Sequence, residues 1–495
     1  MKELRVNRMP RLHELTAKEV TESIRSGELT AREYISAIIE RIREVEDRID
    51  SFVTVMEDEA LKRAGDIDYK VRKGDRLGRL CGVAVAVKDN ICTKGIRTTC
   101  SSRMLENFIP PYNATVVEKL LSEDAIIIGK TNMDEFAMGS TTETSYFGPT
   151  KNPWDLTRVP GGSSGGSAAS VSSGEATVAL GSDTGGSIRC PASYCSIVGL
   201  KPTYGLVSRY GLIAYANSLE QIGPMARNTY DCALLLSVIG GYDPKDSTSA
   251  KVEPKDYTSS LNGPIDGLRI GVPEEFFGEG TDERVAREVW RAIHKLEDLG
   301  AVCEEVSLPS LEFALAAYYI IAMSEASSNL ARFDGVRYGY RVEDDGSDWS
   351  TVYSKNRRFG FGPEVRRRII LGTYALSAGY YDQYYLKALR IRTLIRRDFE
   401  KSLREFDILA GPTMPIPPFK LGEKIHDPLE LYMCDILTVP ANLAGYPAIS
   451  IPCGFIDGLP VGLQLIGGPF TEDLLLRAAY TFEGAKGLTS IRPPI

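Results

Sequence analysis

The chain has 495 residues, of which 43% are hydrophobic and 25% are charged, the composition of an ordinary soluble protein. It contains no run of about 18 consecutive apolar residues, so we expect no membrane span. A formal net charge of −8 argues against a broad nucleic-acid-binding surface on this chain, so any RNA in its biology is expected on a partner.

The cysteines and the first residues together predict the cellular location. The nine cysteines are scattered, odd in number and free of any C-x-x-C pair, which favours a reducing compartment over a disulfide framework or a zinc ribbon. Residues 1–15 lack the apolar core of a secretory signal peptide. We therefore expect a cytoplasmic protein without a metal site.

Helix start signals dominate the N-terminal segment. Thr16 and Glu19 form a capping box, and the same signal recurs at Thr30. Gly27 is placed to end the first helix, and isoleucines recur at helical spacing over residues 35–42. The pattern predicts two helices in tandem, joined by a short turn.

Short apolar runs and longer helical patterns then alternate to the C-terminus. Valines alternate over residues 83–87, so a strand is predicted to run into Lys88. Later strands are predicted at residues 125–130, 268–272, 301–306, 407–411, 448–452 and 461–467, and helices at residues 115–122, 282–299, 364–403 and 472–483. This interleaving predicts an α/β protein. Residues 240–264 are the loosest stretch, and they connect two halves of the chain.

Two loops rich in glycine and serine carry the strongest chemical signal. Residues 161–167 read GGSSGGS, and residues 181–189 read GSDTGGSIR. Glycines let successive N–H groups converge on one point, where they can stabilise an oxyanion while a serine attacks a carbonyl carbon. Such loops also make turns or phosphate cradles, but neither a G-x-G-x-x-G nor a Walker A motif is present.

The scarcity of histidine narrows the choice of general base. Only His13, His294 and His426 are present, and none lies near the two loops in sequence. A Ser-His-Asp hydrolase stays an alternative, because residues 161–165 formally fit G-x-S-x-G and a fold can bring a distant histidine close. So few candidates nevertheless favour a base other than histidine.

The paired loops, with KDN at residues 88–90, resemble the amidase signature family, and the resemblance covers nearly the whole chain. It implies the fold of that family, a large mixed β-sheet flanked by helices. In this fold, residues 1–75 are expected to form a helical segment that packs on a catalytic domain at residues 76–495.

The resemblance also implies a Ser-Ser-Lys triad. Ser187 corresponds to the nucleophile, Ser163 to an intermediary held by a cis peptide bond, and Lys88 to the base. Lys88 would take a proton from Ser163, which takes one from Ser187. Backbone N–H groups are expected to stabilise the oxyanion, and the candidates are those of Thr184, Gly185, Gly186 and Ser187.

This chemistry requires a neutral lysine. A free lysine has a pKa of about 10.4, and burial can lower it by up to about 3–5 units. The apolar residues 81–87 lead into Lys88 and suit such burial. The alternative is an exposed lysine just after a strand.

Within the family, longer segments are similar to the glutamine-hydrolysing subunits of tRNA-dependent amidotransferases. Examples are KTNMDEFAMG at residues 130–139, RFDGVRYG at 332–339 and EVRRRIILG at 364–372. The resemblance implies glutamine as ammonia donor and a heterotrimer with B and C subunits. It places tRNA mainly on the B subunit, with ATP and Mg on that same partner, and no cofactor on this chain.

The same comparison points to residues that would bind glutamine. Arg367 or Arg368 would bind its carboxylate, and Asp435 its ammonium group. Adjacent residues of a helix face about 100° apart, so only one arginine is expected to point inward. A solvated helix face is the alternative for each arginine, and a helix cap is the alternative for Asp435.

Two other functions remain open at this point. A stand-alone amidase acting on small carboxamides would share the triad but not the charged substrate site or the partners. A catalytically silent scaffold would have no need of three matched triad residues. The sequence does not determine whether Glu-tRNA(Gln), Asp-tRNA(Asn) or both are acceptors, nor the route of ammonia.

Overall fold

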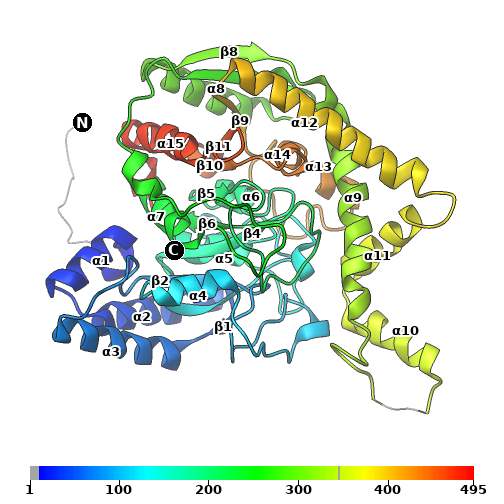
Figure 1. The fold of residues 1–495 in the computed structure, drawn as a ribbon, viewed down its shortest axis with the longest axis horizontal. Helices are drawn as coiled ribbons and strands as arrows, with labels where there is room; N and C mark the ends of the chain where they lie inside the picture. Colours follow the sequence, from blue (N-terminus) through cyan, green and yellow to red (C-terminus); the bar gives the residue numbers. More distant parts are fainter. Residues whose placement is uncertain (1–10, 344–345) are drawn as a thin grey trace.

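A computed structural model describes residues 11–343 and 346–495, and within this part the strands form one 11-stranded mixed sheet flanked by helices (Figure 1). The spatial order is β1-β3-β2-β4-β6-β5-β10-β11-β9-β7-β8. The predicted α/β class is confirmed. The strands are β1 (Phe52–Val55), β2 (Ala84–Lys88), β3 (Ile126–Thr131), β4 (Val178–Asp183), β5 (Val198–Lys201), β6 (Gln221–Ala226), β7 (Arg269–Pro273), β8 (Val302–Val306), β9 (Ile408–Pro412), β10 (Ala448–Ile456) and β11 (Leu459–Gly467).

Helices are interspersed with the strands along the chain, after two helices at the N-terminal end. They include a helix in each region where the sequence predicts one. They are α1 (Ala17–Ser26), α2 (Ala31–Ile49), α3 (Glu57–Lys73), α4 (Thr115–Ser122), α5 (Gly165–Ser173), α6 (Arg189–Tyr194), α7 (Thr229–Ile239), α8 (Glu283–Asp298), α9 (Ala314–Asn329), α10 (Trp349–Gly360), α11 (Pro363–Ala375), α12 (Lys387–Glu405), α13 (Pro428–Met433), α14 (Val439–Ala444) and α15 (Glu472–Lys486).

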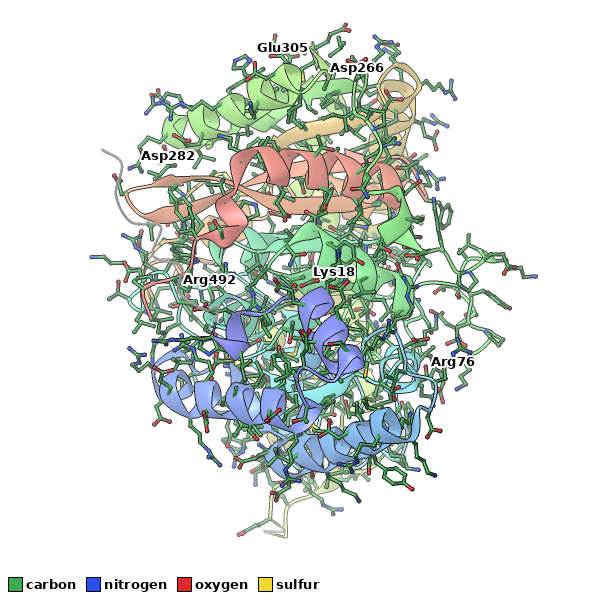
Figure 2. All side chains as sticks on the ribbon, turned by 90° about the vertical axis from the view of Figure 1, so that its left-hand side faces the viewer. Lys18, Arg76, Asp266, Asp282, Glu305 and Arg492 are labelled. Carbon is green, nitrogen blue, oxygen red and sulfur yellow. The ribbon has the colours of Figure 1, made fainter. Side chains whose placement is uncertain are left out.

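The N-terminal helices begin and end as their capping signals predict. The side chain of Thr16 accepts a hydrogen bond from the N–H of Glu19, and Thr30 caps α2 in the same way. Gly27 ends α1 in the left-handed conformation, at φ 80°. Figure 2 shows these helices side by side below α15 and α8, with Lys18 marking α1.

The N-terminal segment and the sheet share one hydrophobic core. Val20 of α1 and Ile35 of α2 are buried in the same cluster as Val85 and Val87 of β2. Burial of this apolar surface holds the helices on the sheet. The division between residues 1–75 and 76–495 itself stays a prediction.

One predicted helix is in fact two. The pattern over residues 364–403 predicts a continuous helix, whereas α11 ends at Ala375 and α12 begins at Lys387. Leu376 caps α11, and Gly379 then adopts φ 87°, a left-handed conformation that a right-handed helix does not contain. The tyrosines around it maintain an apolar period through the break, so the sequence pattern does not reveal it.

The expected cytoplasmic location rests on the cysteines and on N-terminal residues, and the structure describes only some of these. All nine cysteines are free thiols. Among residues 11–343 and 346–495, no helix is long and apolar enough to cross a membrane. Residues 1–10, which carry most of the signal-peptide argument, lie outside the described residues. The cytoplasmic location therefore stays a prediction.

Candidate active site

Two neighbouring parallel strands bring the predicted triad together. Lys88 is the last residue of β2, and Asp183 is the last residue of β4, which pairs with β2 in parallel. The carboxyl ends of these strands lie at the same edge of the sheet. Ser187 follows β4 directly, and Ser163 precedes α5, which packs on both strands.

The lysine meets the first loop through short hydrogen bonds. Its Nζ lies 2.7 Å from Ser163 Oγ, 2.8 Å from Ser164 Oγ and 3.3 Å from the carbonyl oxygen of Ser182. The peptide bond between Gly162 and Ser163 is cis, as the family resemblance implies. Ser164 is a second lysine partner that the sequence analysis did not single out, although the doubled serine of GGSS was its visible signal.

The nucleophile candidate lies beside this pair. The N–H of Ser164 donates to the carbonyl oxygen of Ser187 over 3.1 Å, which ties the two loops together. Lys88 and Ser163 are fully buried, whereas Ser187 is 7% exposed. Ser187 is thus the member of the three that is open to a substrate.

Burial gives Lys88 the property that a base needs. It lowers the pKa of Lys88 from 10.5 to about 7, although the carboxylates of Asp134 and Asp183 act in the opposite direction. A large fraction of the lysine is therefore neutral near pH 7 and can accept a proton.

The second loop is held by a buried ion pair. Burial would raise the pKa of Asp183, but the Arg189 guanidinium outweighs it and the pKa is lowered to about 2. Arg189 also donates to Gln464 and Asn442, at 2.6 Å each. The loop therefore has a fixed negative charge beneath it and a rigid frame.

One predicted oxyanion donor is already engaged. The N–H of Gly186 donates to Asp183 Oδ1 over 2.8 Å, so it faces the bracing carboxylate and is corrected here to a structural role. The N–H groups of Thr184, Gly185 and Ser187 are the remaining candidates. A Cβ on Gly185 would come within 2.4 Å of the Tyr318 hydroxyl, so this position has room only for glycine.

A buried aspartate outside the predicted site supports the first loop. Asp134 accepts hydrogen bonds from the N–H of Thr142 at 2.8 Å and the hydroxyl of Thr144 at 2.8 Å. Its own N–H donates to the carbonyl oxygen of Ser163 over 3.3 Å. A Cβ on Gly162 would come within 2.1 Å of its Oδ2. No sequence pattern indicated this role.

The structure separates the two candidate arginines on α11. Arg368 is 2% exposed, whereas the side chain of Arg367 is 42% exposed. Both pair with Glu364, Arg367 from the outer side and Arg368 from within at 2.7 Å. Arg368 also donates to the hydroxyl of Tyr215 over 2.9 Å. Only Arg368 therefore points into the protein.

Arg368 and Asp435 border the same group of tyrosines. The guanidinium of Arg368 lies 5.3 Å from the ring of Tyr319 and 5.2 Å from that of Tyr432, and these two rings stack at 4.1 Å. The Tyr319 hydroxyl donates to Asp435 over 2.7 Å. A cation and a carboxylate thus meet at one aromatic cluster.

Asp435 is also linked to the loop that Asp134 organises and to the second glycine/serine loop. Ser140, in the loop organised by Asp134, donates to Asp435 over 2.7 Å. Thr438 donates to the carbonyl oxygens of Asp435, at 3.1 Å, and of Gly185, at 2.5 Å. Asp435 is therefore part of the wall of the triad site, not a helix cap alone.

The histidines take no part in the site. His294 pairs with Glu297 on the surface of α8, and His13 lies near Gly174 at the end of α5. His426 lines a cavity next to Glu143. In the described residues, none of the three bonds to Ser163 or Ser187, which removes the basis for a Ser-His-Asp hydrolase.

The family model described as Amidase matches residues 33–476 of this chain. The chain belongs to the amidase signature family. This amidase-signature chain is 58% identical to the A subunit of glutamyl-tRNA(Gln) amidotransferase from Moorella thermoacetica, over 98% of the chain and 99% of that relative. It is 59% identical to the protein of the same name from Methanosarcina barkeri, over 97% and 98% respectively.

Solved structures of the family agree with this fold. The A subunit of glutamyl-tRNA(Gln) amidotransferase from Thermotoga maritima is 42% identical, covers 95% of each chain and superposes with a TM-score of 0.79. A bacterial aryl acylamidase of the amidase signature family is 26% identical, covers 98% of this chain and 100% of its own, and superposes with a TM-score of 0.86. The enzyme thus shares its fold with relatives that differ in substrate.

Proposed function

We propose that this amidase-signature enzyme hydrolyses glutamine and supplies the ammonia to a partner subunit, which amidates Glu-tRNA(Gln) or Asp-tRNA(Asn). The observation that carries the proposal is that buried Arg368 and buried Asp435 both contact Tyr319 beside the triad. A free amino acid presents one carboxylate and one ammonium group, and this pair offers one partner to each. A simple apolar amide has no charged group to offer either side chain, so it would make use of neither.

The protonation state of Asp435 fits an ammonium ligand. Burial raises its pKa to about 6, although the hydroxyls of Tyr319 and Ser140 counteract this. The carboxylate is therefore mostly ionised at pH 7 and can bind a cation. Glu364 and the Tyr215 hydroxyl hold Arg368 in place, and a substrate carboxylate would bind the N–H groups that these two partners do not use.

The proposed acylation uses the hydrogen bond between Lys88 and Ser163, with Ser187 on the neighbouring loop as the nucleophile. Ser187 Oγ attacks the side-chain amide carbon of glutamine while its proton passes to Ser163, whose own proton passes to Lys88 Nζ. The negative charge on the amide oxygen is stabilised by backbone N–H groups at Thr184, Gly185 and Ser187. Collapse of this intermediate breaks the C–N bond, and the proton on Lys88 returns through Ser163 to the departing ammonia.

Deacylation repeats the sequence with water. The γ-glutamyl ester on Ser187 is attacked by a water molecule, whose proton passes through Ser163 to Lys88. Collapse of the second intermediate releases glutamate and restores the Ser187 hydroxyl with that proton. No group outside the triad and its loop is needed, so the proposal includes no cofactor on this chain.

The assembly is part of the same proposal. The relatives named above are A subunits of an amidotransferase, which supports a cytoplasmic heterotrimer with B and C subunits. In this assembly, tRNA, ATP and Mg bind mainly on the B subunit. The negative net charge of this chain is consistent with a limited direct role in tRNA binding.

The test measures glutamine hydrolysis by the purified chain alone, and then with B and C subunits, ATP and mischarged tRNA. Ser187→Ala is the control. We expect slow hydrolysis that rises with the partners and disappears in the control. A chain that cleaves simple amides rapidly, and is indifferent to glutamine and to both subunits, would instead be a stand-alone amidase.

A further inference from the structure

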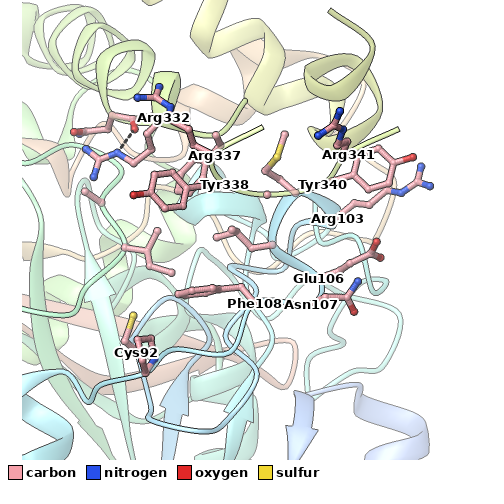
Figure 3. Close-up of a pocket in the computed structure, with 18 of the residues that line it drawn as sticks. Cys92, Arg103, Glu106, Asn107, Phe108, Arg332, Arg337, Tyr338, Tyr340 and Arg341 are labelled. Atoms are coloured by element: carbon pink, nitrogen blue, oxygen red, sulfur yellow. Dashed lines mark hydrogen bonds between the residues drawn. The ribbon is translucent and has the colours of Figure 1, made fainter. Parts of the chain in front are cut away.

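A second cavity, of about 920 Å³, lies outside the triad and the substrate residues. Segment 103–112 forms one wall, the loop at residues 332–341 forms the other, and residues 212–214 lie at its base. Figure 3 shows Arg332, Arg337 and Arg341 along the loop, with Phe108 and Cys92 across the cavity. We call this cavity the arginine pocket.

The loop of the arginine pocket is fixed by the chain itself. The N–H of Tyr340 donates to the carbonyl oxygen of Met104 over 2.8 Å. Gly339 adopts φ 92°, and a Cβ there would come within 2.4 Å of Met104 Sδ. Asp334 accepts from the N–H groups of Val336 and Arg337, at 2.8 Å each. The pocket is thus formed before anything binds in it.

The lining is strongly cationic. Among its described residues there are four arginines, one acid, Glu106, and no lysine. Arg337 pairs with Asp334, but its side chain is 68% exposed. The arginines are Arg103, Arg332, Arg337 and Arg341. An anionic occupant would therefore meet four guanidinium groups, which the carboxylates of Glu106 and Asp334 neutralise only in part.

Aromatic side chains stand beside these cations. Tyr338 is 58% exposed and Tyr112 is 41% exposed, although both are large amphipathic groups. Arg103 stacks over Tyr340 with its guanidinium carbon 4.3 Å from the ring centre, and its Nε is buried without a hydrogen-bond partner. Exposed tyrosine beside arginine is the composition of the energetic centre of a protein interface.

We propose that the arginine pocket docks an acidic segment of a partner subunit, anchored by an aromatic or aliphatic side chain. This inference rests on the proposed function, because that function supplies the partner. A protein segment fits better than RNA, because the chain as a whole carries a formal net charge of −8 and its cations here stand beside exposed tyrosines. Lysine is depleted, and arginine and tyrosine are enriched, at protein interfaces.

The pocket lies directly behind the substrate site. Ala214 lines it and precedes Tyr215, whose hydroxyl accepts a hydrogen bond from Arg368. Asn329 also lines it and donates to the carbonyl oxygen of Tyr215 over 3.1 Å. A docked segment would thus rest on the residues that hold the glutamine-binding arginine.

The experiment compares two double variants of the full chain in binding to the co-purified B and C subunits. The test variant is Arg337→Glu with Arg341→Glu. The control is Arg287→Glu with Arg291→Glu, two arginines on α8 with side chains 62% and 67% exposed. Affinity is measured by biolayer interferometry at low and high salt, without and with tRNA.

We expect the test variant to bind the subunits at least about tenfold more weakly, with a flatter salt dependence, while the control binds normally. Its glutamine hydrolysis without partners should be unchanged, which also shows that it is folded. Tyr338→Ala, which alters no charge, should weaken binding as well and serves if the double variant fails to fold.

Two results would overturn the inference and leave the proposed function intact. One is equal affinity of the pocket variants and the control. The other is a loss of affinity that appears only with tRNA, which would make RNA the occupant. If the unmodified chain binds neither subunit, the proposed function fails and the inference fails with it.

Discussion

Replacing Lys88 by methionine tests the buried-base argument through stability as well as activity. Methionine has a similar length and no charge, so it fits the same space without the desolvation penalty. The folded state lowers the pKa of Lys88 from 10.5 to about 7, whereas the unfolded chain leaves it near its usual value. Folding therefore disfavours protonation of Lys88. The resulting loss in the free energy of unfolding grows as the pH falls from 10.5 to 7.

The magnitude follows from about 1.4 kcal/mol for each pH unit. At pH 6 the full difference applies, so the buried lysine costs about 5 kcal/mol; at pH 9 the cost is about 2 kcal/mol. Methionine removes this cost but also loses the hydrogen bonds to Ser163 and Ser164, worth about 1 kcal/mol each. The variant should thus be about 3 kcal/mol more stable at pH 6 and nearly equal at pH 9.

The assay is urea unfolding of both proteins, followed by circular dichroism at pH 6 and pH 9, with glutamine hydrolysis measured in parallel. Activity should be lost at both pH values. A stability difference that does not change with pH would refute the reasoning, because it would mean that Lys88 titrates alike in the folded and unfolded chains.

Three further results are expected. The kcat/KM for glutamine hydrolysis should fall about tenfold per pH unit below about pH 7, because Lys88 must be neutral to act as a base. Asp134→Asn removes a carboxylate that favours the protonated lysine, so it should move this acidic limb of the pH profile to lower pH. A limb that stays in place would show that Asp134 only holds its loop. Arg368→Lys should raise the KM for glutamine about 100-fold, and Arg367→Lys less than about threefold, in steady-state assays; equal effects would contradict the assignment. Gly186→Ala should lower kcat about 100-fold or more, because residue 186 has φ 136° and its Cβ would come within 2.3 Å of Thr438 Oγ1. A fully active variant would show that the loop can move to accommodate the Cβ.

Much of the fold could be predicted because local signals decide it. The capping boxes at Thr16 and Thr30 and the glycine at position 27 placed the first helices correctly. α9 was missed for a physical reason: it is buried on most of its surface, so its apolar residues do not follow a helical period. β1 has only four residues, which is too short for an alternating pattern to stand out.

The site could be predicted only in part. The triad residues lie in contiguous motifs, so the family resemblance identified them directly. Tyr319 acts through Asp435, 116 residues away, and Asp134 and Glu364 act through neighbours whose placement depends on how the loop and the helix fold. The choice between Arg367 and Arg368 depended on how α11 is rotated against α9, which tertiary packing alone decides.

The proposed bond-breaking residues and the proposed glutamine-binding residues come from different parts of the chain. Lys88, Ser163 and Ser187 lie on β2 and on the loops around α5 and β4, whereas Arg368 and Asp435 come from α11 and the segment between α13 and α14. Evolution can therefore rebuild the second set without touching the first. The aryl acylamidase, at 26% identity with a TM-score of 0.86, is a relative that shares the fold and whose name indicates action on aryl amides. Substitutions on α11 and between α13 and α14 are therefore expected to change specificity while the proposed triad stays in place.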